Sequence, residues 1–235
     1  MTCLSLRRQR LNPKKMTDAS LFLDFDGTIS PVDISNSFFT RFATPDAAQA
    51  VEDWKRGLIS SKDCLRREVD AYHGDIVALK EFARSQEIDE GFYRIKQVCD
   101  EKGIDISIVS DGLDYYIRPF LARHGVDETL YTNCLEVDGG RRKLSFPYFN
   151  ESCGRCANCK SSHVQAAKGQ GRLVIYVGDG LSDKCAASQA DIVFAKRDLA
   201  GYCEENGVPY TRFDHLDEVA RAIASLDLAG LVRPE

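Results

Sequence analysis

An apolar run that ends in two aspartates constrains this chain more than any other feature. Residues 21–25 have the length and composition of a buried strand, and the turn-forming Gly27 and Thr28 follow at once. Asp24 and Asp26 therefore stand where a buried strand opens into a loop. Two like charges held this close are unfavourable unless a cation or a proton separates them, so the pair predicts a divalent metal. The plainer alternative is a strand end whose acids are only solvated.

Two more apolar strands end in polar turns. Residues 105–110 form a strand-length run before the turn at 111–112, and residues 173–177 form another before the turn at 178–183. Helical patterns separate the strands, and a β-hairpin is expected at about 130–146. This order predicts an α/β fold whose parallel sheet is covered by helices on both faces. The ligand crevice of such a sheet lies outside the carboxyl ends of its strands, so we expect the three endings to converge.

The spacing of apolar residues becomes helical after the first strand. From 31 to 100 they recur at three- and four-residue intervals, which predicts an inserted α-helical cap. We expect residues 18–30 and 101–235 to form the α/β core. Residues 1–17 are basic and lack an apolar core, so we expect a disordered tail and not a secretory signal. A start at Met16 would also give a complete domain.

Composition argues against several classes of protein. The formal net charge is −5, which argues against nucleic acid as the main partner. No apolar run approaches the roughly 18 residues of a membrane span, so no membrane partner is expected. The nine cysteines are odd in number and mostly scattered, unlike a secreted disulfide framework, and we therefore expect a reducing cytoplasm. The sequence predicts no oligomeric state.

Carboxylates and one lysine supply the groups that phosphoryl chemistry needs. Hard oxygen ligands suit Mg²⁺, and the predicted ligands are Asp24, Asp179, the backbone carbonyl of Asp26, and Asp183, which would bind directly or through water. Asp24 would be the nucleophile and form an aspartyl-phosphate. Asp26 would protonate the leaving oxygen and later deprotonate water. Lys160, at the start of a predicted helix, would stabilise the negative charge of the transition state.

The same crevice would hold the phosphate and the rest of the substrate. Ser110 and the amides of the turn at 111–112 would bind phosphoryl oxygens. The full set of predicted phosphate- and substrate-binding residues is Asp24, Gly27, Thr28, Asp33, Ser110, Asp111, Gly112 and Lys160.

These motifs resemble, in type and order, those of the haloacid dehalogenase superfamily. The family pattern is D-x-D-G-T, a strand-ending Ser or Thr, a Lys, and G-D-x-x-x-D, which correspond here to residues 24–28, Ser110, Lys160 and 178–183. The resemblance implies a Rossmann-like core and a Mg²⁺-dependent phosphatase that acts on a small phosphorylated substrate. Dehalogenases of the family lack the second aspartate, so Asp26 favours phosphoryl chemistry. The alternatives are a phosphotransferase that uses the same aspartyl-phosphate and a non-catalytic regulator that binds metal and phosphate.

The helical insertion resembles the cap of the phosphoserine phosphatase branch. In that branch a cap arginine binds the substrate carboxylate, and the corresponding position here is Glu68, although the register could slip onto Arg66 or Arg67. Loss of this arginine would weaken, without removing, the alternative that the chain is a phosphoserine phosphatase. Asp33 corresponds to the branch's other substrate-binding acid, which would contact a substrate amine or hydroxyl or simply cap a helix.

A cysteine-rich segment before Lys160 gives the closest subgroup resemblance. Residues 152–160 are similar to the same region of the methionine-salvage enol-phosphate phosphatases and of the phosphoethanolamine/phosphocholine phosphatases. The spacing of Cys153, Cys156, Cys159 and His163 could also hold a structural zinc, with Cys134 as another candidate fourth ligand. Reduced thiols that pack a loop, or a reversible disulfide, are the alternatives.

Overall fold

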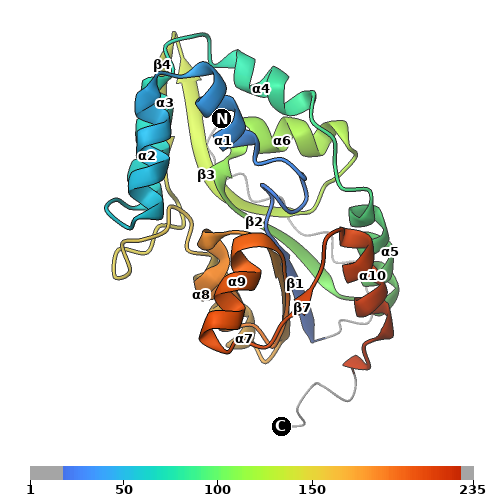
Figure 1. Ribbon diagram of the computed structural model, residues 1–235. Coiled ribbons are helices and arrows are strands. Elements are labelled where there is room, and N and C mark those ends of the chain that lie inside the picture. The colour runs from blue at the N-terminus through green and yellow to red at the C-terminus, as the bar shows by residue number, and fades with distance from the viewer. Residues whose placement is uncertain (1–17, 229–235) are drawn as a thin grey trace.

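A seven-stranded sheet runs through the computed structural model, which describes residues 18–228 (Figure 1). Its strand order is β4-β3-β2-β1-β5-β6-β7, and neighbouring strands are parallel except for β3 and β4. The strands are β1 (Ala19–Leu23), β2 (Asp105–Leu113), β3 (Thr129–Asp138), β4 (Arg141–Ser145), β5 (Leu173–Gly178), β6 (Ile192–Ala195) and β7 (Thr211–Arg212). The predicted parallel sheet and hairpin are confirmed. The tail predicted for residues 1–17 lies outside the described residues.

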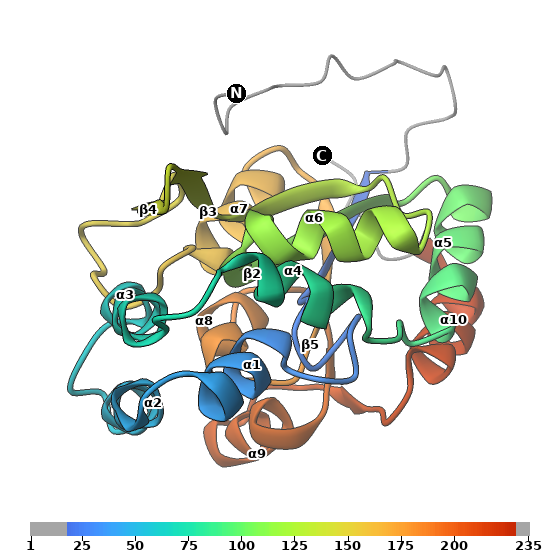
Figure 2. The same cartoon turned by 90° about the horizontal axis from the view of Figure 1, so that it is seen from above.

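Helices cover both faces of the sheet (Figure 2). Successive residues of a strand point to opposite faces, so Leu21 and Leu23 join one apolar cluster and Phe22 the other. The helices on the first face are α5 (Gly91–Lys102), α6 (Asp114–Arg123) and α10 (Leu216–Ser225); those on the second are α7 (Lys160–Lys168), α8 (Lys184–Ala187) and α9 (Arg197–Asn206). Burial on both faces explains why the central strands are apolar along their whole length.

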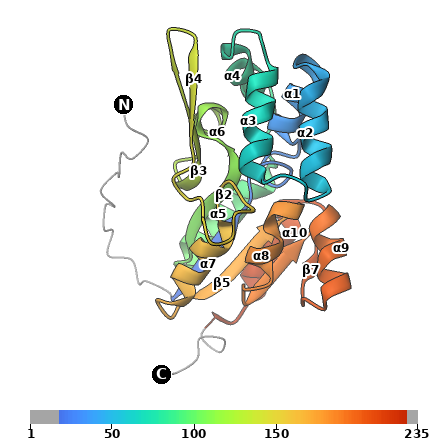
Figure 3. The same cartoon turned by 90° about the vertical axis from the view of Figure 1, so that its left-hand side faces the viewer.

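Four further helices form a layer beyond the carboxyl ends of the strands (Figure 3). They are α1 (Ile34–Phe42), α2 (Pro45–Lys55), α3 (Ser61–Ala71) and α4 (Val77–Arg84). Aromatic rings join α1 to the end of α3 and to α4, because the Phe38 ring centroid of α1 lies 4.9 Å from that of Tyr72 and 5.7 Å from that of Phe82. The hairpin also contacts this layer, since Arg142 donates a hydrogen bond to the Val69 carbonyl at 3.0 Å.

Helix α5 lies within the range 31–100 that the sequence assigned to the cap, but it packs elsewhere. It contacts α10 and β2, and a Cβ on Gly91 would lie 2.1 Å from the backbone nitrogen of Asp217. Phe92 and Ile95 of α5 are buried in the cluster that also contains Leu216 of α10. We therefore propose that the cap ends before α5 and that this helix belongs to the core.

Strand β2 continues beyond the point at which the sequence predicted its end. It was expected to stop at Ser110, but it extends to Leu113, with an irregular register against β3 between Val109 and Leu113. Residues 110–112 thus form a bulge within the strand and not a turn after it, and a bulge redirects side chains at a sheet edge. Within residues 18–228, no helix is long and apolar enough to cross a membrane.

Candidate active site

The carboxyl ends of β1 and β5 lie side by side and bring the motifs at residues 24–28 and 178–183 together. The backbone N–H of Asp24 donates to the Val177 carbonyl at 2.9 Å, and the Thr28 hydroxyl donates to Asp179 Oδ1 at 3.3 Å. A cavity of about 350 Å³ opens here between the core and the cap. Of the predicted site residues, it is lined by Asp24, Asp26, Asp33, Ser110, Asp111, Gly112, Lys160 and Asp179, whereas Gly27, Thr28 and Asp183 are buried beside it. The three predicted strand endings therefore do converge.

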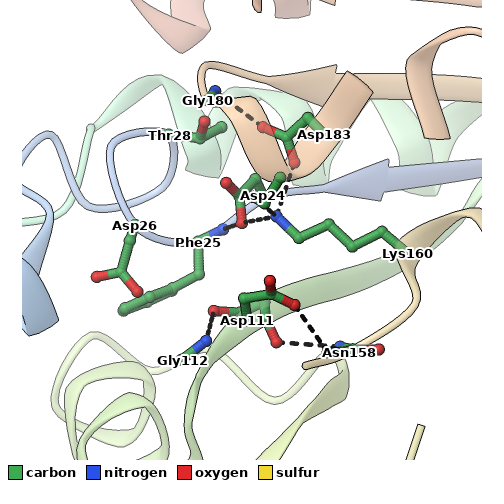
Figure 4. A network of polar contacts seen from close by, with 12 residues as sticks. Asp24, Phe25, Asp26, Thr28, Asp111, Gly112, Asn158, Lys160, Gly180 and Asp183 are labelled. Carbon is green, nitrogen blue, oxygen red and sulfur yellow. Dashed lines mark hydrogen bonds and ion pairs between the residues drawn. The ribbon is translucent and has the colours of Figure 1, made fainter. Parts of the chain in front are cut away.

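Lys160 connects the carboxylates at the centre of the site (Figure 4). Its Nζ lies 2.7 Å from Asp24 Oδ1 and 2.7 Å from Asp183 Oδ1, and it donates to the Ser182 hydroxyl at 3.0 Å. The side chain is 2% exposed. Burial alone would lower the pKa of this ammonium, but the Asp183 and Asp24 carboxylates raise it above its usual value. Lys160 is therefore a fixed positive charge next to the expected nucleophile.

Asp183 is fully buried and has hydrogen-bond partners at both carboxylate oxygens. Oδ1 accepts from Lys160 and from the Tyr176 hydroxyl at 2.6 Å. Oδ2 accepts from the backbone N–H groups of Asp179 at 3.1 Å and Gly180 at 3.0 Å. These bonds orient both Lys160 and the loop that carries Asp179. Of the two predicted modes of metal binding by Asp183, the four bonds favour binding through water.

One group of side chains within residues 18–228 has the geometry to hold a metal. Carboxylate oxygens of Asp24, Asp179 and Asp183 all lie within 4.8 Å of one another. Burial and then the charge of Asp183 raise the pKa of Asp24 well above its usual range and that of Asp179 to about 6. Three carboxylates meet two basic groups, the Lys160 ammonium and the Arg197 guanidinium beside Asp179, so one negative charge stays uncompensated, which a bound cation would balance. The donor set therefore fits Mg²⁺.

Arg197, to which the sequence assigned no role, pairs with Asp179. Its Nη1 lies 3.0 Å from Asp179 Oδ2, and its Nη2 donates to the Pro31 carbonyl at 3.1 Å. Gly27, with φ of 78°, makes room for this pair, because a Cβ there would lie 2.2 Å from Asp179 Oδ2 and 2.9 Å from Arg197 Nη1. Glycine at position 27 is thus required by the nearby Asp179 and Arg197 side chains and not only by the turn in which it lies.

The Asp26 side chain points away from Lys160 and is not part of the carboxylate cluster (Figure 4). Its Oδ2 accepts from the Tyr116 hydroxyl at 2.6 Å, and its Oδ1 from the Ile34 backbone N–H at 2.9 Å. Burial and the nearby Asp33 raise the pKa of Asp26 to about 8, although the Tyr116 bond opposes the shift. The sequence did not identify Tyr116, which lies 90 residues away along the chain. A protonated Asp26 suits the predicted role of general acid.

The β2 bulge and the segment before Lys160 are joined by Asn158, which the sequence analysis did not single out. Asn158 is fully buried and donates through Nδ2 to the carbonyls of Ser110 at 3.0 Å and Tyr131 at 2.9 Å, while its N–H donates to Asp111 Oδ1 at 2.8 Å. Ser110 Oγ accepts from the Gly112 N–H at 3.0 Å, so this amide, predicted to bind phosphate, already has a partner. The one sequence feature that could have pointed to Asn158 is its position two residues before Lys160.

Two cap acids line the same cavity. Asp33 caps α1, accepting from the Asn36 N–H at 2.9 Å, and so fulfils the structural alternative predicted for it while facing the cavity. Glu68 is buried in the cavity wall. Arg66 and Arg67 do not line the cavity: the first lies over the Phe146 ring and the second pairs with Asp53 at 3.1 Å. Of the three positions that the sequence left open, Glu68 is the one that lines the cavity.

The cysteine-rich segment does not form a metal site in the described residues. Cys153, Cys156 and Cys159 with His163 or Cys134 supply no group of ligand atoms close enough to share a metal. His163 instead hydrogen-bonds through Nε2 to Asn158 Oδ1 at 2.9 Å and stacks on the Tyr131 ring. Burial lowers its pKa to about 4. This histidine therefore supports the position of Asn158.

Comparison with known proteins identifies similar sequences along most of the chain. A family model described as haloacid dehalogenase-like hydrolase matches residues 21–188. A Bacillus mycoides protein named 2-hydroxy-3-keto-5-methylthiopentenyl-1-phosphate phosphatase is 30% identical over 216 residues, covering 88% of this chain and 96% of its own length. An Exiguobacterium sibiricum protein of the same name is 29% identical over 206 residues, covering 83% and 91%.

Solved structures share the fold at lower sequence identity. A phosphoserine phosphatase, solved as a phospho-aspartyl intermediate analogue, superimposes with a TM-score of 0.68 at 19% identity, covering 89% of this chain and 99% of that one. A phosphoserine phosphohydrolase-like protein from Francisella tularensis gives a TM-score of 0.65 at 22% identity, covering 87% and 99%. At these identities the likeness concerns the fold alone.

Proposed function

The chain belongs to the haloacid dehalogenase-like hydrolase family, and from this premise we propose that it is a Mg²⁺-dependent phosphomonoester hydrolase that works through an aspartyl-phosphate. One observation carries the proposal: Lys160 lies 2.7 Å from both Asp24 and Asp183, while Asp26 is held apart by Tyr116 and Ile34. The site thus separates a nucleophilic carboxylate from an acid/base carboxylate.

The first half-reaction requires one carboxylate to attack and another to give up a proton. Lys160 keeps an ammonium beside Asp24 Oδ1 and would stabilise negative charge on the phosphoryl oxygens. Asp24 would attack phosphorus and become the aspartyl-phosphate. Asp26, which holds a proton at neutral pH, would donate it to the leaving oxygen.

The second half-reaction uses the same residues. The carboxylate left on Asp26 would take a proton from water, which attacks the phosphoryl group and releases Asp24. Tyr116 and the Ile34 amide hold Asp26 in place between the two steps. Mg²⁺ would be held by Asp24, Asp179 and the carbonyl of Asp26, with Asp183 through water, and would neutralise phosphate charge so that a carboxylate can approach it.

The cavity below the cap and the names of the similar proteins indicate which substrate to propose. A cavity of about 350 Å³ that cap helices line on one side suits a small phosphorylated metabolite. We propose as substrate the enol phosphate in the name of the curated relatives, 2-hydroxy-3-keto-5-methylthiopentenyl-1-phosphate. Phosphoserine is disfavoured, because the cavity wall presents Glu68 where a carboxylate would need a cation. The cytoplasmic location remains a prediction from cysteine usage.

The test is phosphate release from a panel of phosphomonoesters with Mg²⁺ and with a chelator. We expect release only with Mg²⁺, and we expect Asp24→Asn to lower kcat at least 10³-fold while the far-ultraviolet circular dichroism stays unchanged. The exposed Asp46, replaced by Asn, is the matched control and should keep wild-type turnover. Turnover by Asp24→Asn close to that of the wild type would refute the mechanism, and transfer of phosphate to an added alcohol would indicate a phosphotransferase.

A further inference from the structure

Glu68 is a buried acid for which the proposed mechanism has no use. It lies on α3, is 7% exposed and lines the cavity that contains Asp24 and Asp26. Within the part of the chain that the structure describes, no basic side chain is within ion-pair distance of it. Its hydrogen bond is from the thiol of Cys64 at 3.9 Å, a weak donor. A buried carboxyl without a cation is a costly arrangement, and its position in the cavity wall connects it to the ligand.

The surroundings of Glu68 keep its carboxyl group protonated. A carboxylate removed from water without a counter-ion takes up a proton. Burial first, and then the charges of Asp33 and Asp26, raise the pKa of Glu68 to about 8. At neutral pH the side chain therefore presents an O–H donor and a carbonyl acceptor to the cavity.

A second unused polar group lies in the same wall. Ser35 of α1 is 9% exposed, and its hydroxyl has no hydrogen-bond partner in the described residues. Apolar side chains complete the cap side of the cavity, among them Val51, Trp54 and Leu65. Two hydroxyl donors beside an apolar wall complement an oxygen acceptor attached to an apolar chain.

From this juxtaposition we propose that Glu68 is a specificity-determining residue that hydrogen-bonds an uncharged carbonyl or hydroxyl oxygen of the leaving group and excludes leaving groups with a carboxylate. The inference rests on the proposed phosphohydrolase function and specifies its substrate class: phosphate esters of uncharged, oxygen-bearing alcohols or enols. Unlike a point charge, a protonated carboxyl recognises an oxygen by direction and distance.

Charged leaving groups fit the wall less well. A carboxylate would lie against the acids Asp33 and Glu68, and Arg66 and Arg67 do not line the cavity to receive it. Lys55 and Arg197 do line it, but they are already paired with Glu52 and Asp179. An ammonium carries no acceptor, so it would leave the O–H of the protonated Glu68 carboxyl without a hydrogen-bond partner. An uncharged oxygen meets neither difficulty.

The experiment compares kcat/KM for three small esters that differ in charge: dihydroxyacetone phosphate, phosphoethanolamine and phosphoserine. For the wild type we expect dihydroxyacetone phosphate to be preferred at least tenfold over each of the other two. Glu68→Gln retains a donor and an acceptor, so kcat/KM should fall no more than about fivefold. Glu68→Leu should lower kcat/KM for dihydroxyacetone phosphate at least tenfold through KM. Glu68→Arg should shift the ratio toward phosphoserine at least tenfold.

Controls separate this inference from the proposed function. Asp70 is exposed on the same helix, and Asp70→Asn should leave all three values unchanged. If Glu68→Leu does not fold, the Gln and Arg variants still decide the matter. A wild-type preference for phosphoethanolamine or phosphoserine, or unchanged ratios in Glu68→Arg, would overturn the inference while leaving the hydrolase intact. No phosphate release from any ester would remove the hydrolase and the inference with it.

Discussion

Among the single residues of the site, Gly27 leaves no room for a side chain. Its φ of 78° lies in the region that glycine adopts readily, and a Cβ would overlap Asp179 Oδ2 at 2.2 Å. A Gly27→Ala change therefore combines backbone strain with displacement of an expected metal ligand. We predict a fall of at least 100-fold in kcat/KM at saturating Mg²⁺, measured by phosphate release.

A Gly125→Ala variant separates backbone strain from the displacement of Asp179. The φ of Gly125 is 67°, and a Cβ there would meet nothing within 4 Å. Gly125→Ala should lower the free energy of unfolding by about 1 kcal/mol through strain alone, with kcat/KM unchanged. Equal losses of activity in the two variants would show that the overlap with Asp179 is unimportant.

The sequence predicted which charged residues gather at the cavity, but it did not predict the residues that hydrogen-bond to them. Asp24, Asp26, Lys160 and Asp179 were found because a carboxylate or lysine at a strand or helix end stands out against an apolar background. Asn158 and Tyr116, by contrast, work through contacts with segments distant in sequence. Only the packed structure determines such contacts.

Between elements, α5 and α10 approach each other closely at Gly91. A Cβ on Gly91 would lie 2.1 Å from the Asp217 nitrogen and 2.5 Å from the Leu216 carbonyl carbon, which are backbone atoms that cannot move without moving α10. Gly91→Ala should lower the free energy of unfolding by about 2 kcal/mol, despite the better helix propensity of alanine. Urea denaturation measures this change.

Gly201 within α9 is a control for Gly91, because a side chain there has free space around it. No atom lies within 4 Å of a Cβ built there, so Gly201→Ala should raise the free energy of unfolding by about 0.5 to 1 kcal/mol from propensity alone. Stabilisation by both substitutions would mean that α5 does not pack closely against α10.

The spacing of apolar residues predicted which segments are helices and which are strands. Where those segments end depends on contacts with other parts of the fold. The hairpin turn at Gly139 and Gly140 and the apolar strand β5 are local patterns that a sequence carries by itself. The extension of β2 to Leu113 depends on pairing with β3 across a bulge, and the placement of α5 depends on α10. Neither β3 nor α10 can be identified as a packing partner from the residues next to β2 or α5 in the sequence.

For the whole molecule, the carboxylate cluster joins segments that are far apart in sequence, the end of β1 and the loop after β5. A cation that binds the folded state and not the unfolded one raises stability by about 2.7 kcal/mol at 100 times its Kd. We therefore predict that saturating Mg²⁺ raises the Tm by about 5 to 10 °C over the metal-free protein. Differential scanning fluorimetry with Mg²⁺ and with a chelator measures the shift.

Asp179→Asn makes this prediction sharper because its two effects have opposite signs. Burial and then the charge of Asp183 raise the pKa of Asp179 to about 6, so at pH 7 its charged form destabilises the metal-free fold, a penalty that disappears as the pH falls below 6. The variant should therefore have a higher Tm than the wild type in chelator at pH 7, yet a much smaller shift with Mg²⁺. Asp46→Asn removes an exposed charge instead and should keep the full shift. If Asp179→Asn retained the wild-type shift, Mg²⁺ would be binding elsewhere, and the charge imbalance around Lys160 would need another explanation.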